Sequence, residues 1–198
     1  MVTNKNQGII LLKFIATIFI TYSHMAILFP NYQELVTGGA IGDGLFFFCS
    51  GFTLFLGRND GFINWYKRRI NRIYPTIIMW AIFSSTIFMW QWNITDIITT
   101  PRYWFISCIM IYYAIFYVIR NYMFQHLKTT FLLATTIVIV SYFIILDLNK
   151  SMMYADVSYM RIYYFLFMLL GAMTALQKEK TIPPKKSLSY ILLSLICY

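Results

Sequence analysis

The stretch LLKFIATIFITYSHM, residues Leu11 to Met25, is an apolar run that contains two ionisable side chains. It belongs to a longer apolar segment, Gly8–Phe29, and about 20 such residues are enough to cross a bilayer as a helix. Lys13 and His24 would then lie at membrane depth, where an ionisable group is costly and usually marks a functional site. The sequence therefore raises the question of what these two side chains do there.

The composition of the whole chain indicates a membrane protein. Of its 198 residues, 60% are hydrophobic, 20% are aromatic and only 12% are charged, whereas soluble domains have about 25% charged residues. Six apolar runs are long enough to be complete spans, namely Gly8–Phe29, Ala40–Gly57, Ile73–Trp92, Tyr103–Ile119, Thr130–Leu146 and Tyr159–Leu176. We therefore predict an all-α fold, a polytopic transmembrane helix bundle that forms a single domain over residues 1–198.

A seventh apolar run begins at Leu188 and stops after about half the length of a span. We therefore expect the membrane domain to be incomplete at its C terminus. Three scattered cysteines, Cys49, Cys108 and Cys197, have neither the pairing of a disulfide framework nor the spacing of metal ligands. They are expected to be buried thiols within helices.

The distribution of basic residues predicts the orientation, because lysine and arginine prefer cytoplasmic segments. With the N terminus inside, the inner segments hold Lys5, Arg58, Lys67, Arg68, Arg69, Arg72, Arg120, Lys128, Lys178, Lys180, Lys185 and Lys186. The outer segments hold only Arg102, Lys150 and Arg161. The net charge of +9 is thus explained by topology, and no nucleic-acid partner is expected.

Helical geometry places Lys13 and His24 on one face of the first span. Eleven residues at about 100° each return close to the starting direction, about 16 Å further along the axis. Thr17 and Thr21 fall on the same face, which predicts a polar stripe facing a protein interior or a wet cavity. Alternatively, Lys13 snorkels to the headgroups, His24 is a plain interfacial residue, and the threonines bond back to the preceding turn.

The second span begins GGAIGDGLFFFCSGFTLF. Gly38 and Gly42 have the small-xxx-small spacing that favours close helix packing in lipid. Asp43 lies near the level assigned to His24 and is either an interfacial acid or a group that orients the histidine. Ser50, at mid-membrane, is expected to make a helix contact.

A basic connection, GFINWYKRRINRIYP, precedes the third span. If it is helical, Arg69 and Arg72 point the same way and together suit phosphate. Trp65 and Tyr66 would then anchor it at the membrane interface. The alternative is an ordinary cluster of positive charges on the cytoplasmic side.

Three of these stretches, KFIATIFITYSHM, GDGLFFFCSGFTLF and RRINRIYP, resemble in order and spacing the membrane-bound acyltransferase-3 family. The shared pattern is a basic residue followed after ten residues by a histidine, then an FF..SGF element, then R-x-x-R. YWFISCIMIYY, from Tyr103 to Tyr113, is also similar to a helix of such proteins. The family is typically longer than this chain, and it has more membrane helices.

The resemblance implies transfer of an acyl group, often acetyl, from cytosolic acyl-coenzyme A to a hydroxyl of a sugar or cell-surface glycan. It assigns His24 and Lys13 to the essential basic–histidine pair and Arg69 and Arg72 to the coenzyme's phosphates. His24 would act as general base, and Lys13 would orient the thioester or its arm. The expected partners are the acyl-coenzyme A co-substrate, the glycan acceptor and the bilayer of the cell membrane, with no metal and no permanently bound cofactor.

Two other classes of function stay open on the sequence. A polar stripe with ionisable groups at two depths also suits a transporter or flippase. A shortened chain could instead be an inactive membrane protein. A transporter would move substrate without consuming acyl-coenzyme A, and an inactive chain would do neither.

Overall fold

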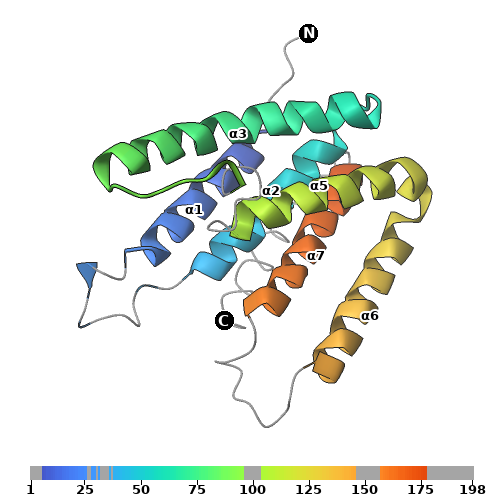
Figure 1. Ribbon diagram of the computed structural model, residues 1–198. Coiled ribbons are helices and arrows are strands. Elements are labelled where there is room, and N and C mark those ends of the chain that lie inside the picture. The colour runs from blue at the N-terminus through green and yellow to red at the C-terminus, as the bar shows by residue number, and fades with distance from the viewer. Residues whose placement is uncertain are drawn as a thin grey trace.

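The computed structural model describes residues 6–25, 28–29, 31, 36, 38–95, 104–145 and 157–177. Within these ranges it is all-helical and has no strand, which confirms the predicted class. The helices are α1 (Gln7–Ser23), α2 (Gly39–Phe55), α3 (Phe62–Ile87), α5 (Trp104–Tyr122), a 3-10 turn η3 (Phe124–His126), α6 (Leu127–Ile145) and α7 (Val157–Leu176) (Figure 1). The apolar run from Leu188, and Cys197, lie outside the described residues.

Helix α2 packs against α1 on one side and α7 on the other, and glycines set both contacts. A Cβ added to Gly42 would lie 2.8 Å from the Ala16 carbonyl oxygen of α1. A Cβ on Gly171 of α7 would lie 2.0 Å from the Phe48 carbonyl oxygen of α2. The absence of a side chain therefore lets the backbones touch, as small residues do at membrane helix contacts, and the predicted close packing at Gly42 is confirmed.

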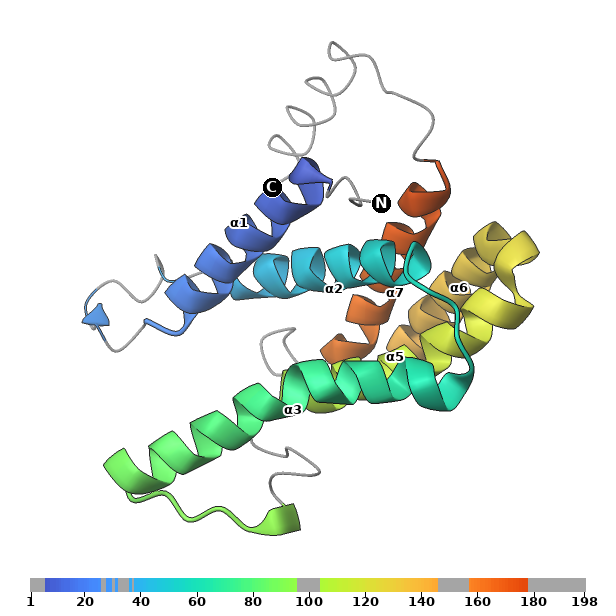
Figure 2. The same cartoon turned by 90° about the horizontal axis from the view of Figure 1, so that it is seen from above.

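Helix α3 begins eleven residues before the predicted third span and continues through Pro75. The basic connection is therefore helical, and its first turns pack on α5 (Figure 2). Trp65 is fully buried against the rings of Tyr113 and Tyr117, and the Tyr66 hydroxyl donates to the Met110 carbonyl at 3.3 Å. The prediction that Trp65 sits at the membrane interface is thus wrong, because this face of the helix is used for packing.

The connection between α2 and α3 is fastened to the end of α5. The Arg120 guanidinium donates to the carbonyl oxygens of Gly57 and Arg58, and the side chains of Asn59 and Asn121 hydrogen-bond at 2.6 Å. The Tyr117 hydroxyl donates to the Asp60 carbonyl at 3.2 Å. These bonds fix where the basic residues of the connection lie.

Two helical segments of the described residues, Trp104–Tyr122 and Phe124–Ile144, are long and apolar enough to cross a membrane. Gln7–Ser23, Gly39–Phe55 and Arg161–Leu176 are apolar but shorter. Helix α1 ends at Ser23 and not at the predicted Phe29, and the His24 N–H caps it by donating to the Thr21 carbonyl. The six-span count and the inside N terminus remain predictions.

Candidate functional site: a cationic cavity between α1, α2, α3 and α5

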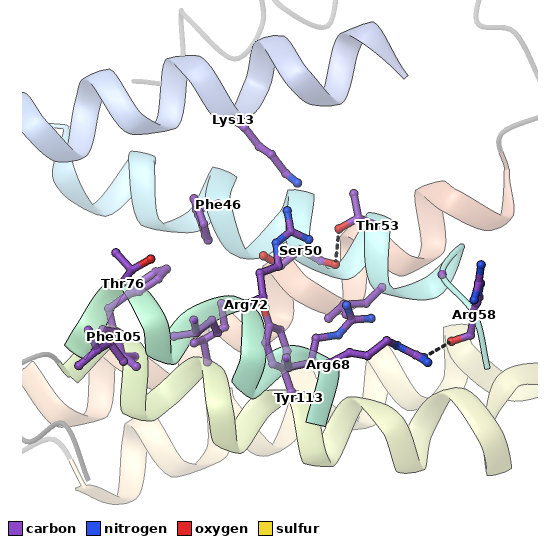
Figure 3. A pocket seen from close by; sticks show the side chains of 17 residues that line it. Lys13, Phe46, Ser50, Thr53, Arg58, Arg68, Arg72, Thr76, Phe105 and Tyr113 are labelled. Carbon is purple, nitrogen blue, oxygen red and sulfur yellow. Dashed lines mark hydrogen bonds between the residues drawn. The ribbon is translucent and has the colours of Figure 1, made fainter. Parts of the chain in front are cut away.

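A cavity of about 510 Å³ lies between α1 and α2 on one side and α3 and α5 on the other. Its basic lining residues come from α1, the α2–α3 connection and α3: Lys13, Arg58, Arg68, Arg69 and Arg72 (Figure 3). The described residues that line it include no aspartate or glutamate. The cavity therefore concentrates positive charge. Of its five basic side chains, only that of Arg68 has an ion pair in the described structure, with Asp60 outside the lining, so the cavity suits a polyanionic ligand.

The cavity has a cationic end and an apolar end. Along α2 it extends from Phe46 to Gly57, which is about 16 Å at the rise of an α-helix. Arg58 lies at the Gly57 end, whereas Phe46 and Phe105 lie together at the other end (Figure 3). Their rings meet edge to face with centroids 5.3 Å apart. A ligand with a charged head and a long, less polar arm would match this polarity.

Arg69 is positioned by the packing of α3 on α5. Its guanidinium lies over the Trp65 ring, 4.9 Å from the centroid, and its Nε is buried with no hydrogen-bond partner among the described residues. Burial lowers the pKa of Arg69, and the nearby Arg68 and Arg72 also lower it, although Tyr113 opposes this. Arg69 is thus a desolvated cation that lies among like charges. An anion in the cavity would offset both the cost of desolvation and the repulsion between the cations.

Arg72 and Lys13 enter the cavity from opposite walls. Arg72, one turn beyond Arg68, has an exposed side chain with no ion pair in the described structure. Lys13 reaches in from α1 and is half-buried, and Figure 3 shows Arg72 extending toward it from α3. The structure therefore brings together three of the four residues predicted from the sequence: Lys13, Arg69 and Arg72.

Two hydroxyl groups line the middle of the cavity. Ser50 and Tyr113 are buried, and their side chains lie close enough to interact. Ser50 comes from α2 and Tyr113 from α5, so this pair joins the two walls. Ser50 thus makes the predicted helix contact and also faces the ligand space.

His24 does not line the cavity. It is exposed at the end of α1, beside Ser23, whose side chain approaches Gly39. From Gly39 to Phe46, where the cavity ends, is about 10 Å along α2. His24 and Asp43 interact electrostatically, but no hydrogen bond between them is present in the described structure.

The predicted polar stripe on α1 faces the interior only at Lys13. Thr17, Thr21 and His24 are exposed, so the interior placement predicted for them is wrong for this structure. The physical reason is that, among the described helices, α1 packs mainly on α2, through the face that buries Ala16. Thr17 bonds back to the Lys13 carbonyl at 2.9 Å, which is the alternative role considered for the threonines.

The sequence reasoning did not single out Arg58, Arg68 and Tyr113 as site residues. Arg58 follows α2 directly, and Arg68 precedes Arg69 on the same helix. On the sequence alone, both therefore look like part of the general positive charge of an inner segment. The signal for Arg68 was available, because residues four apart on a helix share a face, which places it with Arg72.

The described residues thus form an all-helical protein with two membrane-capable helices and a cavity that five basic side chains line. The model of the family described as "Acyltransferase domain" (acyltransferase 3) matches residues 6–198. The chain therefore belongs to the acyltransferase-3 family, whose members are membrane proteins. No curated protein and no solved structure gives a significant match.

Proposed function

We propose that this acyltransferase moves a short acyl group from acyl-coenzyme A to a hydroxyl of a sugar or cell-surface glycan. The observation that carries the donor half is the cavity itself, in which five basic side chains meet without a lining carboxylate. Coenzyme A carries its phosphates at one end and its thioester at the other, joined by a long arm. The cavity, with basic residues at one end and phenylalanines at the other, supports the same arrangement of the bound coenzyme.

Arg69 and Arg72 bind the phosphates in this proposal. Guanidinium groups form paired, charge-assisted hydrogen bonds with phosphate oxygens, and Arg69 is already held in place by Trp65. The pantetheine arm then extends past Lys13 and the Ser50–Tyr113 pair, which offer donors to its amide and thioester carbonyls. The acyl group lies toward Phe46 and Phe105.

The aromatic lining at the Phe46 and Phe105 end of the cavity supports a short acyl group such as acetyl. Phe105 is held by Phe46 and by the fully buried Phe47, at centroid distances of 5.3 and 4.9 Å. Close-packed aromatic rings do not yield easily to a longer chain. This end of the cavity therefore acts as a stop for the acyl chain.

His24 is proposed as the general base on the strength of its place in the family pattern. It removes the proton of the acceptor hydroxyl, and the oxygen attacks the thioester carbonyl. The C–S bond then breaks, and the coenzyme leaves as a thiolate, which takes up the proton held by His24. The described cavity stops about 10 Å short of the His24 level along α2. The thioester and the imidazole must therefore come closer for transfer than they lie in this arrangement.

The acceptor and the location rest on the family resemblance and on the predicted topology. With the N terminus inside, the arginines face the cytosol, where acyl-coenzyme A is found, and His24 faces the outer side, where surface glycans lie. The protein would then be a multi-pass protein of the cell membrane, with the bilayer as its third partner.

The test measures acetyl-coenzyme A binding and free coenzyme A release by the purified chain in lipid nanodiscs. It compares the wild type, Arg69→Ala/Arg72→Ala and His24→Ala with Lys67→Ala, since Lys67 is exposed on the same helix and outside the cavity. We expect the double variant to lose binding, His24→Ala to bind without releasing coenzyme A, and Lys67→Ala to match the wild type.

Three results would contradict the proposal. Binding that survives in the double variant would show that the cavity is not the donor site. Transport of a solute across the membrane without release of coenzyme A would identify a transporter. A chain that shows neither transport nor coenzyme A release would be inactive.

A further inference from the structure

We propose that Arg58 and Arg68 form a second phosphate subsite, which recognises the 3′-phosphate on the ribose of coenzyme A, separately from the diphosphate subsite at Arg69 and Arg72. This inference rests on the proposed function. It goes beyond that function by naming two further specificity-determining residues and the group that they bind.

The first support is the position of these residues at the cationic end of the cavity, here called its mouth. Arg58 precedes α3 and lies at the opposite end from Phe46 and Phe105 (Figure 3). Arg72 lies about 6 Å further along α3 than Arg68 and extends toward Lys13. A ligand whose acyl end points to the phenylalanines would place its diphosphate near Arg72 and its phosphorylated ribose near Arg58.

The second support is the way the structure holds the two side chains. Arg68 is ion-paired with Asp60 and also donates to the Arg58 carbonyl at 3.4 Å. Arg120 donates to the same carbonyl oxygen from the end of α5. The backbone of Arg58 is thus fixed by two arginines, whereas its side chain is exposed and has no partner in the described part of the chain. The subsite therefore offers one free guanidinium and one that Asp60 keeps oriented.

The third support is the amount of charge. An acyl carrier with a single phosphodiester group would need only one or two cations to neutralise it. Lys13, Arg69 and Arg72 already supply three. A diphosphate together with a phosphomonoester carries about four negative charges near pH 7, because the second ionisation of a phosphomonoester has a pKa near 6. Arg58 supplies the fourth unpaired cation. The cavity is thus better matched to the complete coenzyme than to its 3′-dephospho form.

The experiment compares the binding of acetyl-coenzyme A and acetyl-3′-dephospho-coenzyme A to the full chain in nanodiscs. We expect the wild type to bind the complete donor about tenfold more tightly, and Arg58→Gln to abolish this preference while its affinity for the dephospho donor stays unchanged. Arg72→Gln should weaken the binding of both donors and keep the preference for the complete donor. Lys67→Gln, on the exposed side of the same helix, should resemble the wild type.

Asp60→Asn provides a second variant that does not depend on removing a cation. It removes the negative charge that competes with a phosphate for Arg68, whereas the amide oxygen of asparagine can still accept from Arg68 and orient it, and the backbone carbonyl of residue 60 still accepts from Tyr117. We expect Asp60→Asn to increase the preference for the 3′-phosphate.

Three outcomes would overturn the inference. A wild type that binds both donors equally has no 3′-phosphate subsite, although the proposed function would stand. An undiminished preference in Arg58→Gln would place the subsite elsewhere. A wild type that binds neither donor would overturn this inference together with the proposed function.

Discussion

Gly51 of α2 lies directly against the backbone of Met168 in α7, so that a Cβ added to the glycine would be 1.8 Å from the Met168 carbonyl oxygen. Main-chain atoms within two helices cannot move aside as a flexible side chain can. The contact therefore fixes the distance between α2, which carries Ser50 and the cavity wall, and α7, which supports it.

Gly51→Ala is predicted to destabilise the protein strongly. Overpacking a close contact costs about 1–3 kcal/mol and occasionally more, and a clash with backbone should lie at the upper end, near 3 kcal/mol. Thermal unfolding in detergent would measure the loss. Gly61→Ala is the matched control, because no atom lies within 4 Å of the added Cβ. Equal stability of the two variants would contradict the close contact.

Arg69→Lys is predicted to weaken donor binding although the charge is retained. A lysine lacks the planar guanidinium that stacks on Trp65 and binds phosphate through two parallel hydrogen bonds. The lost stacking corresponds to about 1 kcal/mol, or roughly five- to tenfold in affinity. Arg72→Lys is the comparison, because Arg72 is exposed. Titration with acetyl-coenzyme A should show the larger loss for Arg69→Lys, and equal losses would argue against a role for Trp65.

The class of the fold and most of the cavity's charge were accessible from the sequence because they depend on local patterns. Apolar runs predict helices wherever they lie, and the spacing of Arg69 and Arg72 predicts a shared face. The role of Trp65 was not accessible, since an interfacial and a buried tryptophan look alike until α5 is placed against it. The mouth of the cavity was also hidden, because Arg58 is positioned by Arg120, which is 62 residues away.

Helix α1 is a second example of a feature that local sequence patterns specify only in part. Its period predicts Lys13 and His24 on one face, but it does not show how far the neighbouring helices extend along that face. The cavity reaches Lys13 and ends before His24. Periodicity specifies direction around a helix axis, whereas burial also depends on which partners are present at each level.

Phe46→Ala is predicted to widen the range of acyl groups that the protein accepts. Removing the ring opens the apolar end of the cavity, and each further buried methylene adds about 0.8 kcal/mol of favourable transfer free energy. Butyryl-coenzyme A has two methylenes more than acetyl-coenzyme A, so its relative affinity should rise roughly tenfold. Competition binding with the two donors would measure this. Phe143→Ala is the control, because Phe143 is an exposed aromatic residue of α6 outside the cavity.

Arg120→Ala is predicted to weaken donor binding without removing a residue of the cavity lining. Its guanidinium holds the carbonyl oxygens of Gly57 and Arg58, and hydrogen bonds to charged groups contribute about 1.5–3 kcal/mol. Without them the α2–α3 connection loses part of its attachment to α5, so Arg58 is no longer held at the mouth. Affinity for acetyl-coenzyme A should fall about tenfold or more. Binding to 3′-dephospho donor should fall less, because Arg69 and Arg72 are positioned by the packing of α3 on α5 and not by this attachment. An equal loss for both donors would show that Arg120 supports the whole cavity and not its mouth alone.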